Sequence, residues 1–172
     1  RQEYLLRPEN FPNGAPGHGS CIVDLGRLQV GVINLMGVVY LESLHCPFET
    51  ADRLLSSMPA ITLVDFHAEA TGEKGALAHY LDGRVSAIFG THTHVQTADE
   101  CILPGGTGFI TDVGMTGPIH SVLGVKPELV IHKMRSKMPV RFFLAGGSCH
   151  MDGIIFSIHD KSGKTVSVER LR

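Results

Sequence analysis

Several features are missing from this sequence of 172 residues, and each absence excludes a class of protein. It contains no tryptophan and no stripe of basic residues interleaved with aromatic ones, and its formal net charge is −2, so nothing predicts nucleic-acid binding in bulk. No run approaches the roughly 18 apolar residues that a membrane helix needs. No basic leader precedes an apolar run, so no signal peptide is predicted, and we expect no membrane partner.

Closely spaced cysteines are also missing. The four cysteines, Cys21, Cys46, Cys101 and Cys149, are scattered, and no two of them have Cys-x-x-Cys spacing. The absence of this spacing excludes a zinc ribbon and a thioredoxin-like motif. A chain of this length does not depend on disulfides, so we expect free thiols and a cytoplasmic location.

What is present predicts a globular α/β domain. Hydrophobic residues make up 43% of the chain and charged residues 19%, enough to form a core. Apolar runs and Gly/Pro punctuation predict helices at 47–57, 73–81 and 127–137, and loops at 8–19 and 114–124. The same signals predict strands at 21–25, 28–35, 61–66, 85–89, 101–103, 108–111, 140–144, 153–159 and 165–171, the first two forming a hairpin. This order favours an α/β sandwich over a doubly wound sheet.

Histidine is unusually common, at ten residues, and three histidines follow predicted buried strands. His67 lies in the segment DFHAE at the end of the strand 61–66. His92 and His94 lie in the segment GTHTH at the end of the strand 85–89. Because the carboxyl ends of neighbouring parallel strands meet at one edge of a sheet, we expect the three imidazoles to converge there. Neutral imidazole binds Zn, Mn or Fe, so the pattern predicts a metal site.

The residues alone leave alternatives open. Three loop histidines bonded to backbone or water would show the same pattern. Three imidazoles could also hold one zinc ion with an open position, as in carbonic anhydrase, whereas a two-metal site usually needs carboxylates as well. Asp65, two residues before His67, is a candidate for orienting a ligand, and so is Asp112. For both carboxylates, turn or cap chemistry is an equally good explanation.

Three segments resemble a known family over almost all of the chain. They are LRPENFPNGAPGHG, DFHAEATGEKGALAHYLDGRVSAIFGTHTHVQTADECILPGGTGFITDVGMTGP and MPVRFF, and they closely resemble bacterial YmdB-like metallophosphoesterases of the calcineurin-like superfamily. The family is associated with 2′,3′-cyclic-nucleotide 2′-phosphodiesterase activity. The resemblance implies a metallophosphoesterase-type β-sandwich flanked by helices.

The resemblance also implies a ligand set and a cofactor. His67 matches the ligand of the DFHAEAT segment, and His92 and His94 match the two ligands of GTHTH. His67 and His92 would hold one divalent ion and His94 the other, with Fe, Mn or Zn as the metal. The implied reaction is the hydrolysis of a small phosphodiester, a 2′,3′-cyclic nucleotide, by water that the two ions activate.

The N-terminal third of the family, which carries the other ligands and the proton donor, has no counterpart in residues 1–172. We therefore expect residues 1–172 to be the C-terminal portion of a single metallophosphoesterase domain, incomplete at its N-terminus and inactive alone. The catalytic proton donor would lie in the missing region. A non-catalytic metal-binding or regulatory fragment and a mononuclear zinc hydrolase remain the alternatives. The sequence also leaves the oligomeric state open. The strand-rich tail would serve equally well as the interface of a homo-oligomer or as part of the core.

Overall fold

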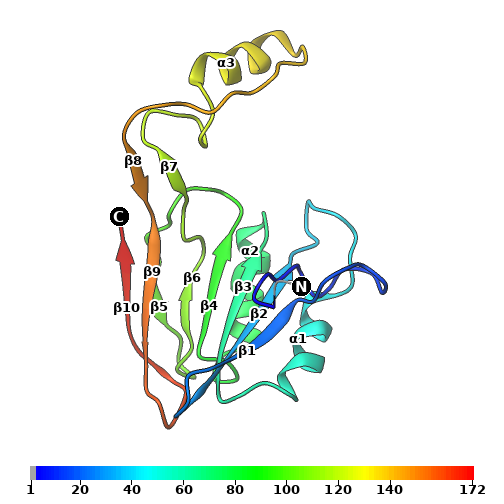
Figure 1. Cartoon of the computed structure of the whole chain (residues 1–172), viewed down its shortest axis with the longest axis vertical. Helices are drawn as coiled ribbons and strands as arrows, with labels where there is room; N and C mark the ends of the chain where they lie inside the picture. Colours follow the sequence, from blue (N-terminus) through cyan, green and yellow to red (C-terminus); the bar gives the residue numbers. More distant parts are fainter. Residues whose placement is uncertain (1–2) are drawn as a thin grey trace.

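A mixed sheet of six strands organises residues 3–172, the part of the chain that the computed structural model describes (Figure 1). The strand order is β1-β2-β3-β4-β6-β5. Strands β2, β3, β4 and β6 are parallel, and the edge strands β1 and β5 are antiparallel to their neighbours. The bounds are β1 Ser20–Asp24, β2 Gln29–Met36, β3 Ile61–His67, β4 Ala87–Thr91, β5 Cys101–Ile102 and β6 Gly108–Ile110.

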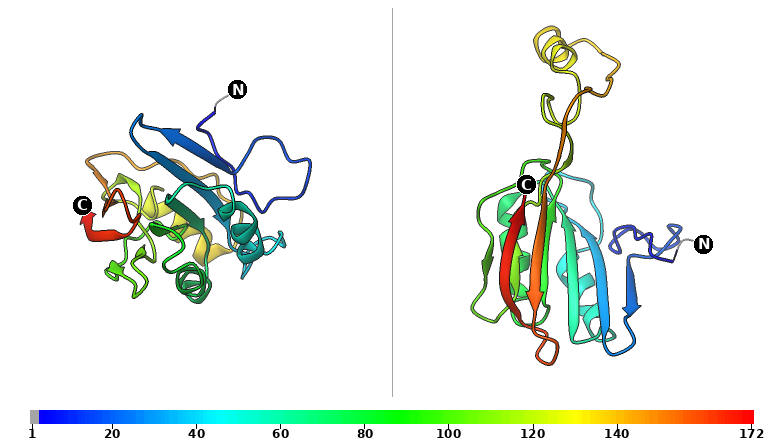
Figure 2. Two further views of the ribbon diagram at one scale, coloured as in Figure 1. Left: turned by 90° about the horizontal axis from the view of Figure 1, so that it is seen from below. Right: turned by 60° about the vertical axis from the view of Figure 1, so that its left-hand side comes forward.

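Two helices cover one face of this sheet. Helix α1 spans Pro47–Leu55 and helix α2 spans Thr71–Tyr80, and Figure 2 shows both behind the sheet. Alternate residues of the central strands point towards them, so Val64 and Phe66 of β3 are fully buried against Leu77 of α2 and its neighbours. Burying a large apolar side chain contributes roughly 1.5–3 kcal/mol, so this layer stabilises the strands that carry the predicted site.

The second layer is an antiparallel pair on the opposite face. It consists of β9 Gly153–Ile158 and β10 Thr165–Leu171. The pair lies close over β6, because a Cβ atom at Gly108 would collide with Phe156 and Thr165. The structure is therefore an α/β sandwich flanked by helices, which confirms the predicted fold class. An apolar hollow of about 360 Å³ lies between the layers, lined by Leu63, Phe89, Val113, Gly153, Ile154, Phe156 and Ile158.

A two-stranded ribbon leaves the sandwich on the side where the parallel strands of the six-stranded sheet end. It pairs β7 Thr116–Pro118 with β8 Cys149–Met151 and carries helix α3, Pro127–Ser136, away from the sheets (Figures 1 and 2). The predicted loop at 114–124 thus contains a short strand. The predicted strand at 140–144 is wrong, since this stretch is mostly exposed and forms only an isolated bridge at Leu144. Its β-branched and aromatic residues have no strand beside them to pair with.

Most other expectations for the described residues are confirmed. The first two strands form the predicted hairpin, and the helices begin and end within a few residues of the predicted limits. All four cysteines are free. Within residues 3–172, no helix combines the length and the apolar character that crossing a membrane requires.

Candidate metal centre at the carboxyl edge of the sheet

His67 and His92 meet where two parallel strands end. The register of β3 and β4 pairs His67 with Thr91, so the next residue, His92, turns towards His67 as the strand ends. The Nε2 atom of His67 lies 2.9 Å from the Nδ1 atom of His92. The two rings are nearly perpendicular, at 81°, with centroids 4.8 Å apart. The structure thus brings together two of the three histidines predicted to converge.

A hydroxyl and a carboxylate hold the ring of His67. The Thr91 hydroxyl lies 3.1 Å from Nδ1 of His67 and donates to Oδ1 of Asp65 at 3.0 Å. Because that hydroxyl donates to Asp65, it accepts from His67, and we assign the proton of His67 to Nδ1. Asp65 therefore acts on His67 through Thr91, and Nε2 is left with a free lone pair, as a metal ligand requires.

A second carboxylate holds the ring of His92. The Nε2 atom of His92 lies 2.9 Å from Oε2 of Glu69. If that nitrogen donates to Glu69, the inner Nδ1 atom of His92 also carries a lone pair, which then faces the lone pair of His67. Two nitrogen lone pairs at this distance repel unless a cation, a proton or a metal ion, lies between them. The backbone at His92 has a φ of 117°, a strained value for a residue with a side chain, and such strain is concentrated at functional sites.

The imidazole pair fits a divalent ion. Nitrogen ligands bond to zinc at about 2.0–2.1 Å, so two of them on one ion lie at roughly the separation seen between His67 and His92. His94, two residues on, is exposed and has a backbone φ of 63°. Within residues 3–172, no group of three or more His, Cys, Asp or Glu side chains is arranged so that it could hold a metal ion. The described residues therefore bring together two nitrogen donors, fewer than a structural or catalytic zinc site uses.

The surroundings keep His67 neutral and Asp65 partly buried. Burial lowers the pKa of His67, and the neighbouring His92 lowers it further. Burial raises the pKa of Asp65, although hydrogen bonds from Thr91 and Asn34 act in the opposite direction. The Asn34 amide donates to Oδ2 of Asp65 at 2.8 Å, while its own buried Oδ1 atom has no hydrogen-bond partner among the described residues. Neutral imidazole is the form that binds metal.

Asp112 holds a backbone turn, one of the two explanations that the sequence left open. Its Oδ2 atom lies 2.9 Å from Nζ of Lys74 and accepts from the backbone N–H of Thr93 at 3.0 Å. Thr93 separates His92 from His94, so Asp112 fixes the turn that carries both histidines. Burial acts to raise the pKa of Asp112, but the Lys74 ammonium and the N–H groups of Thr93 and Gly114 outweigh it and lower the pKa.

Sequence reasoning missed four residues of this centre. Thr91, Asn34 and Lys74 carried no signal of their own, because each acts on a partner 24 to 38 positions away. Glu69 was not assigned to the site, although its position two residues after His67 was a signal that could have found it. Gly90 is needed for close approach, because a Cβ atom there would collide with the Thr111 carbonyl.

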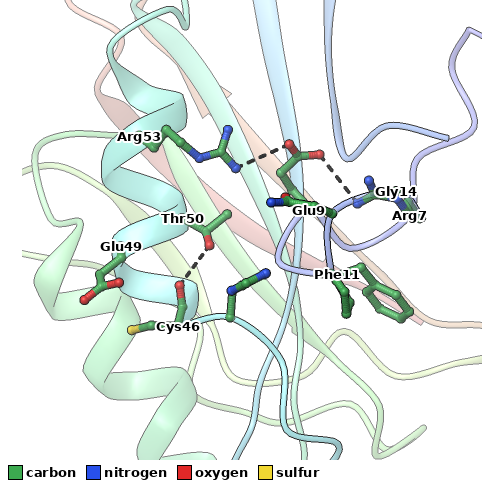
Figure 3. A pocket seen from close by; sticks show the side chains of 11 residues that line it. Arg7, Glu9, Phe11, Gly14, Cys46, Glu49, Thr50 and Arg53 are labelled. Carbon is green, nitrogen blue, oxygen red and sulfur yellow. Dashed lines mark hydrogen bonds and ion pairs between the residues drawn. The ribbon is translucent and has the colours of Figure 1, made fainter. Parts of the chain in front are cut away.

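A separate hollow lies between the N-terminal loop and α1. It measures about 590 Å³, and Figure 3 shows Glu9 reaching between Arg7 and Arg53 on its wall. The Glu9 carboxylate is 3.7 Å from Nη1 of Arg7 and 3.4 Å from Nη2 of Arg53. Both guanidinium groups are thus already paired, and the hollow offers less free positive charge for a phosphate than its two arginines suggest.

The solved structures of similar proteins place this fold in the phosphatase-type class. A structure described as a novel phosphatase from Mycoplasma pneumoniae has a TM-score of 0.92 and 34% sequence identity, and the match covers 99% of this chain and 63% of that one. The chain belongs to the YmdB-like protein family, whose model matches residues 1–171. A hypothetical protein from Thermus thermophilus also has a TM-score of 0.92, with 40% identity over 96% of this chain and 66% of that one.

One curated relative carries the name of a chemical activity. The 2′,3′-cyclic-nucleotide 2′-phosphodiesterase of Bacillus subtilis is 48% identical over 170 residues, which are 97% of this chain and 64% of the relative. The chain therefore spans just under two thirds of the length of that enzyme. The predicted membership of the YmdB-like family is confirmed.

Proposed function

We propose that this chain forms the histidine-bearing part of a metal-dependent phosphodiesterase whose substrates are small phosphodiesters, 2′,3′-cyclic nucleotides among them. The observation that carries the proposal is the pair of inner nitrogens of His67 and His92, 2.9 Å apart at the carboxyl edge of the sheet. The 48% identity to the Bacillus subtilis phosphodiesterase supports the substrate class. Fe, Mn or Zn suits the nitrogen ligands.

Each residue of the centre has a proposed task. His67 and His92 would hold one divalent ion, and His94, on the same turn, would serve a second one. Such ions would supply positive charge to the phosphoryl oxygens and would lower the pKa of water, so that hydroxide is available to attack phosphorus. Asp65 and Glu69 orient the two imidazoles, and Asp112 holds the turn between His92 and His94. These contacts fix the ligand nitrogens before the substrate binds, and preorganisation of this kind lowers the barrier of a polar reaction.

The first test is metal content. Replacing His67 or His92 by Ala should remove most of the bound ion, measured by mass spectrometry of the metals in the purified chain. Replacing His94 by Ala should reduce the stoichiometry if it serves a second ion. His79→Ala is the matched control, because His79 is exposed on α2. Unchanged metal content in both the His67 and His92 variants would overturn the ligand assignment.

The second test is turnover by the natural gene product that contains this chain. Hydrolysis of 2′,3′-cyclic AMP should fall by about 10²-fold or more in the His67 and His92 variants, since ligand loss removes the charge that stabilises the transition state. Arg53→Ala in the separate hollow should leave the rate unchanged. Metal binding without turnover would favour the non-catalytic module, and one ion per active chain would favour a mononuclear hydrolase.

A further inference from the structure

Tyr40 lies on the loop between β2 and α1, residues 37–46, which we call the edge loop. Its side chain is 87% exposed, more than any other large hydrophobic side chain of residues 3–172. Its backbone has a φ of 63°, in the left-handed region that bulky residues rarely adopt. Neither feature stabilises the fold, because an exposed ring gains nothing from burial and such strain is concentrated at functional sites.

The edge loop begins beside the candidate metal centre. The backbone N–H of Gly37 donates to the carbonyl oxygen of His67 at 2.9 Å. A Cβ atom at Gly37 would collide with the Glu73 carboxylate and with the side chain of Ala68, so only glycine lets the loop pass this close to both. The first residue of the edge loop is therefore held against the residue that is proposed to bind the ion.

One buried carboxylate fixes the next two residues of the edge loop. Glu73, in the first turn of α2, is 8% exposed. Its two oxygens accept from the backbone N–H of Val38 at 2.9 Å and from that of Val39 at 3.3 Å. Hydrogen bonds to a charged group are among the stronger ones, so the backbone is anchored as far as Val39. Tyr40 follows directly, and its ring extends into solvent from this anchored backbone.

Tyr40 can reach a nucleotide whose phosphate lies at His67. Three residues extend a chain by at most about 11 Å, so the backbone of Tyr40 stays within that distance of Gly37. Figure 1 shows the edge loop arching beyond the carboxyl end of β2, on the side of the sheet where the metal centre lies. A base is joined to its phosphate through one ribose, and it would extend from the ion over a comparable distance.

We propose that the ring of Tyr40 stacks on the base of the nucleotide substrate. This inference rests on the proposed function, because it takes the phosphate to lie on the ion at His67 and His92. Aromatic side chains stack on every base, since every base has an aromatic face. The larger face of a purine makes a larger contact, so Tyr40 favours 2′,3′-cyclic purine nucleotides over pyrimidine ones. Tyr40 thereby distinguishes nucleotides from small phosphodiesters that carry no base.

Kinetics of the natural gene product that contains this chain test the contact. Tyr40→Ala should raise the KM for 2′,3′-cyclic AMP by about tenfold with kcat nearly unchanged, because the stack is present in the ground state and the transition state alike. Tyr40→Phe keeps the ring and should behave like the natural protein. Ribose 2,3-cyclic phosphate, which has no base, should be hydrolysed equally by all three proteins. Tyr80→Ala is the matched control, because Tyr80 is 44% exposed at the far end of α2.

Nuclear magnetic resonance then detects the stack without turnover. With carbon-13 in the tyrosine rings, the Tyr40 signal is the one that Tyr40→Phe removes. Adenosine 3′-monophosphate, which cleavage of the 2′ ester bond leaves, should shift this signal and leave that of Tyr80 in place. A Tyr40 signal that ignores the nucleotide would overturn the stack, as would an alanine variant that slows the base-free ester as much as cyclic AMP. A shifted signal in a protein that hydrolyses neither ester would support the stack and refute the phosphodiesterase instead.

Discussion

Lys74 of α2 and Asp112 of the loop after β6 form an ion pair closed off from solvent. Their charged atoms are 2.9 Å apart, and the two side chains are 1% and 0% exposed. The same Asp112 oxygen accepts from the Thr93 N–H, between His92 and His94. A buried charge pair under the sheet edge is thereby connected to the turn that carries two proposed metal ligands.

Removing one partner of this pair should be severely destabilising. Lys74→Met leaves Asp112 charged, buried and without its cation, which costs about 3–5 kcal/mol. Urea unfolding followed by circular dichroism measures the change, with Lys137→Met at the exposed C-terminal end of α3 as the control. A loss below about 1 kcal/mol, typical of surface pairs, would show that water or another group replaces Lys74.

The same carboxylate should make stability depend on acidic pH. The pKa of Asp112 is lowered in the folded protein, so its contribution to the free energy of unfolding is complete above the unfolded pKa of about 3.9. That contribution is lost as the pH falls through the folded-state pKa. Melting temperatures of the natural chain and Asp112→Asn should therefore approach each other as the medium is acidified. A gap that is constant with pH would contradict this account.

The hydroxyl of Thr91 should determine how tightly the centre holds its ion. Thr91→Val keeps the shape of the side chain but removes the link between Asp65 and His67, so metal affinity should fall by about 10–100-fold. Thr91→Ser restores a hydroxyl and should recover most of that affinity. Competition with a chromogenic chelator measures both constants. Equal affinity in the valine and serine variants would mean that the hydroxyl does not orient His67.

Two glycines should respond in opposite ways to the same substitution. Gly90→Ala places a methyl group against the Thr111 carbonyl in the middle of the sheet, and we expect a loss of about 3 kcal/mol or more. Gly75→Ala, inside α2, meets nothing within 4 Å and should stabilise the chain by about 0.5–1 kcal/mol. Thermal melting compares the two variants. A tolerated Gly90→Ala would show that β4 and the strand beside it can separate at this point.

The sequence predicted the parts of the structure that local patterns encode. The apolar runs before His67 and His92 predicted two buried parallel strands, and the structure contains them in register. Short strands such as Thr116–Pro118 were not predicted, because three residues that include Gly and Pro show no alternation of apolar and polar side chains. Within the site, the predicted meeting of His67 and His92 is found, while the groups that orient them are not local. Asn34 reaches Asp65 across 31 positions and Lys74 reaches Asp112 across 38, distances over which no spacing rule operates.

The register of β3 and β4 has a consequence for metal exchange. Because strand pairing and the Thr91 hydroxyl set the ring of His67, folding alone would place this proposed donor before an ion arrives. Zinc fingers differ, since they fold only around their ion. Chelators should then empty this centre without melting the domain, and the ion that refills it would be decided by which metal the cell supplies.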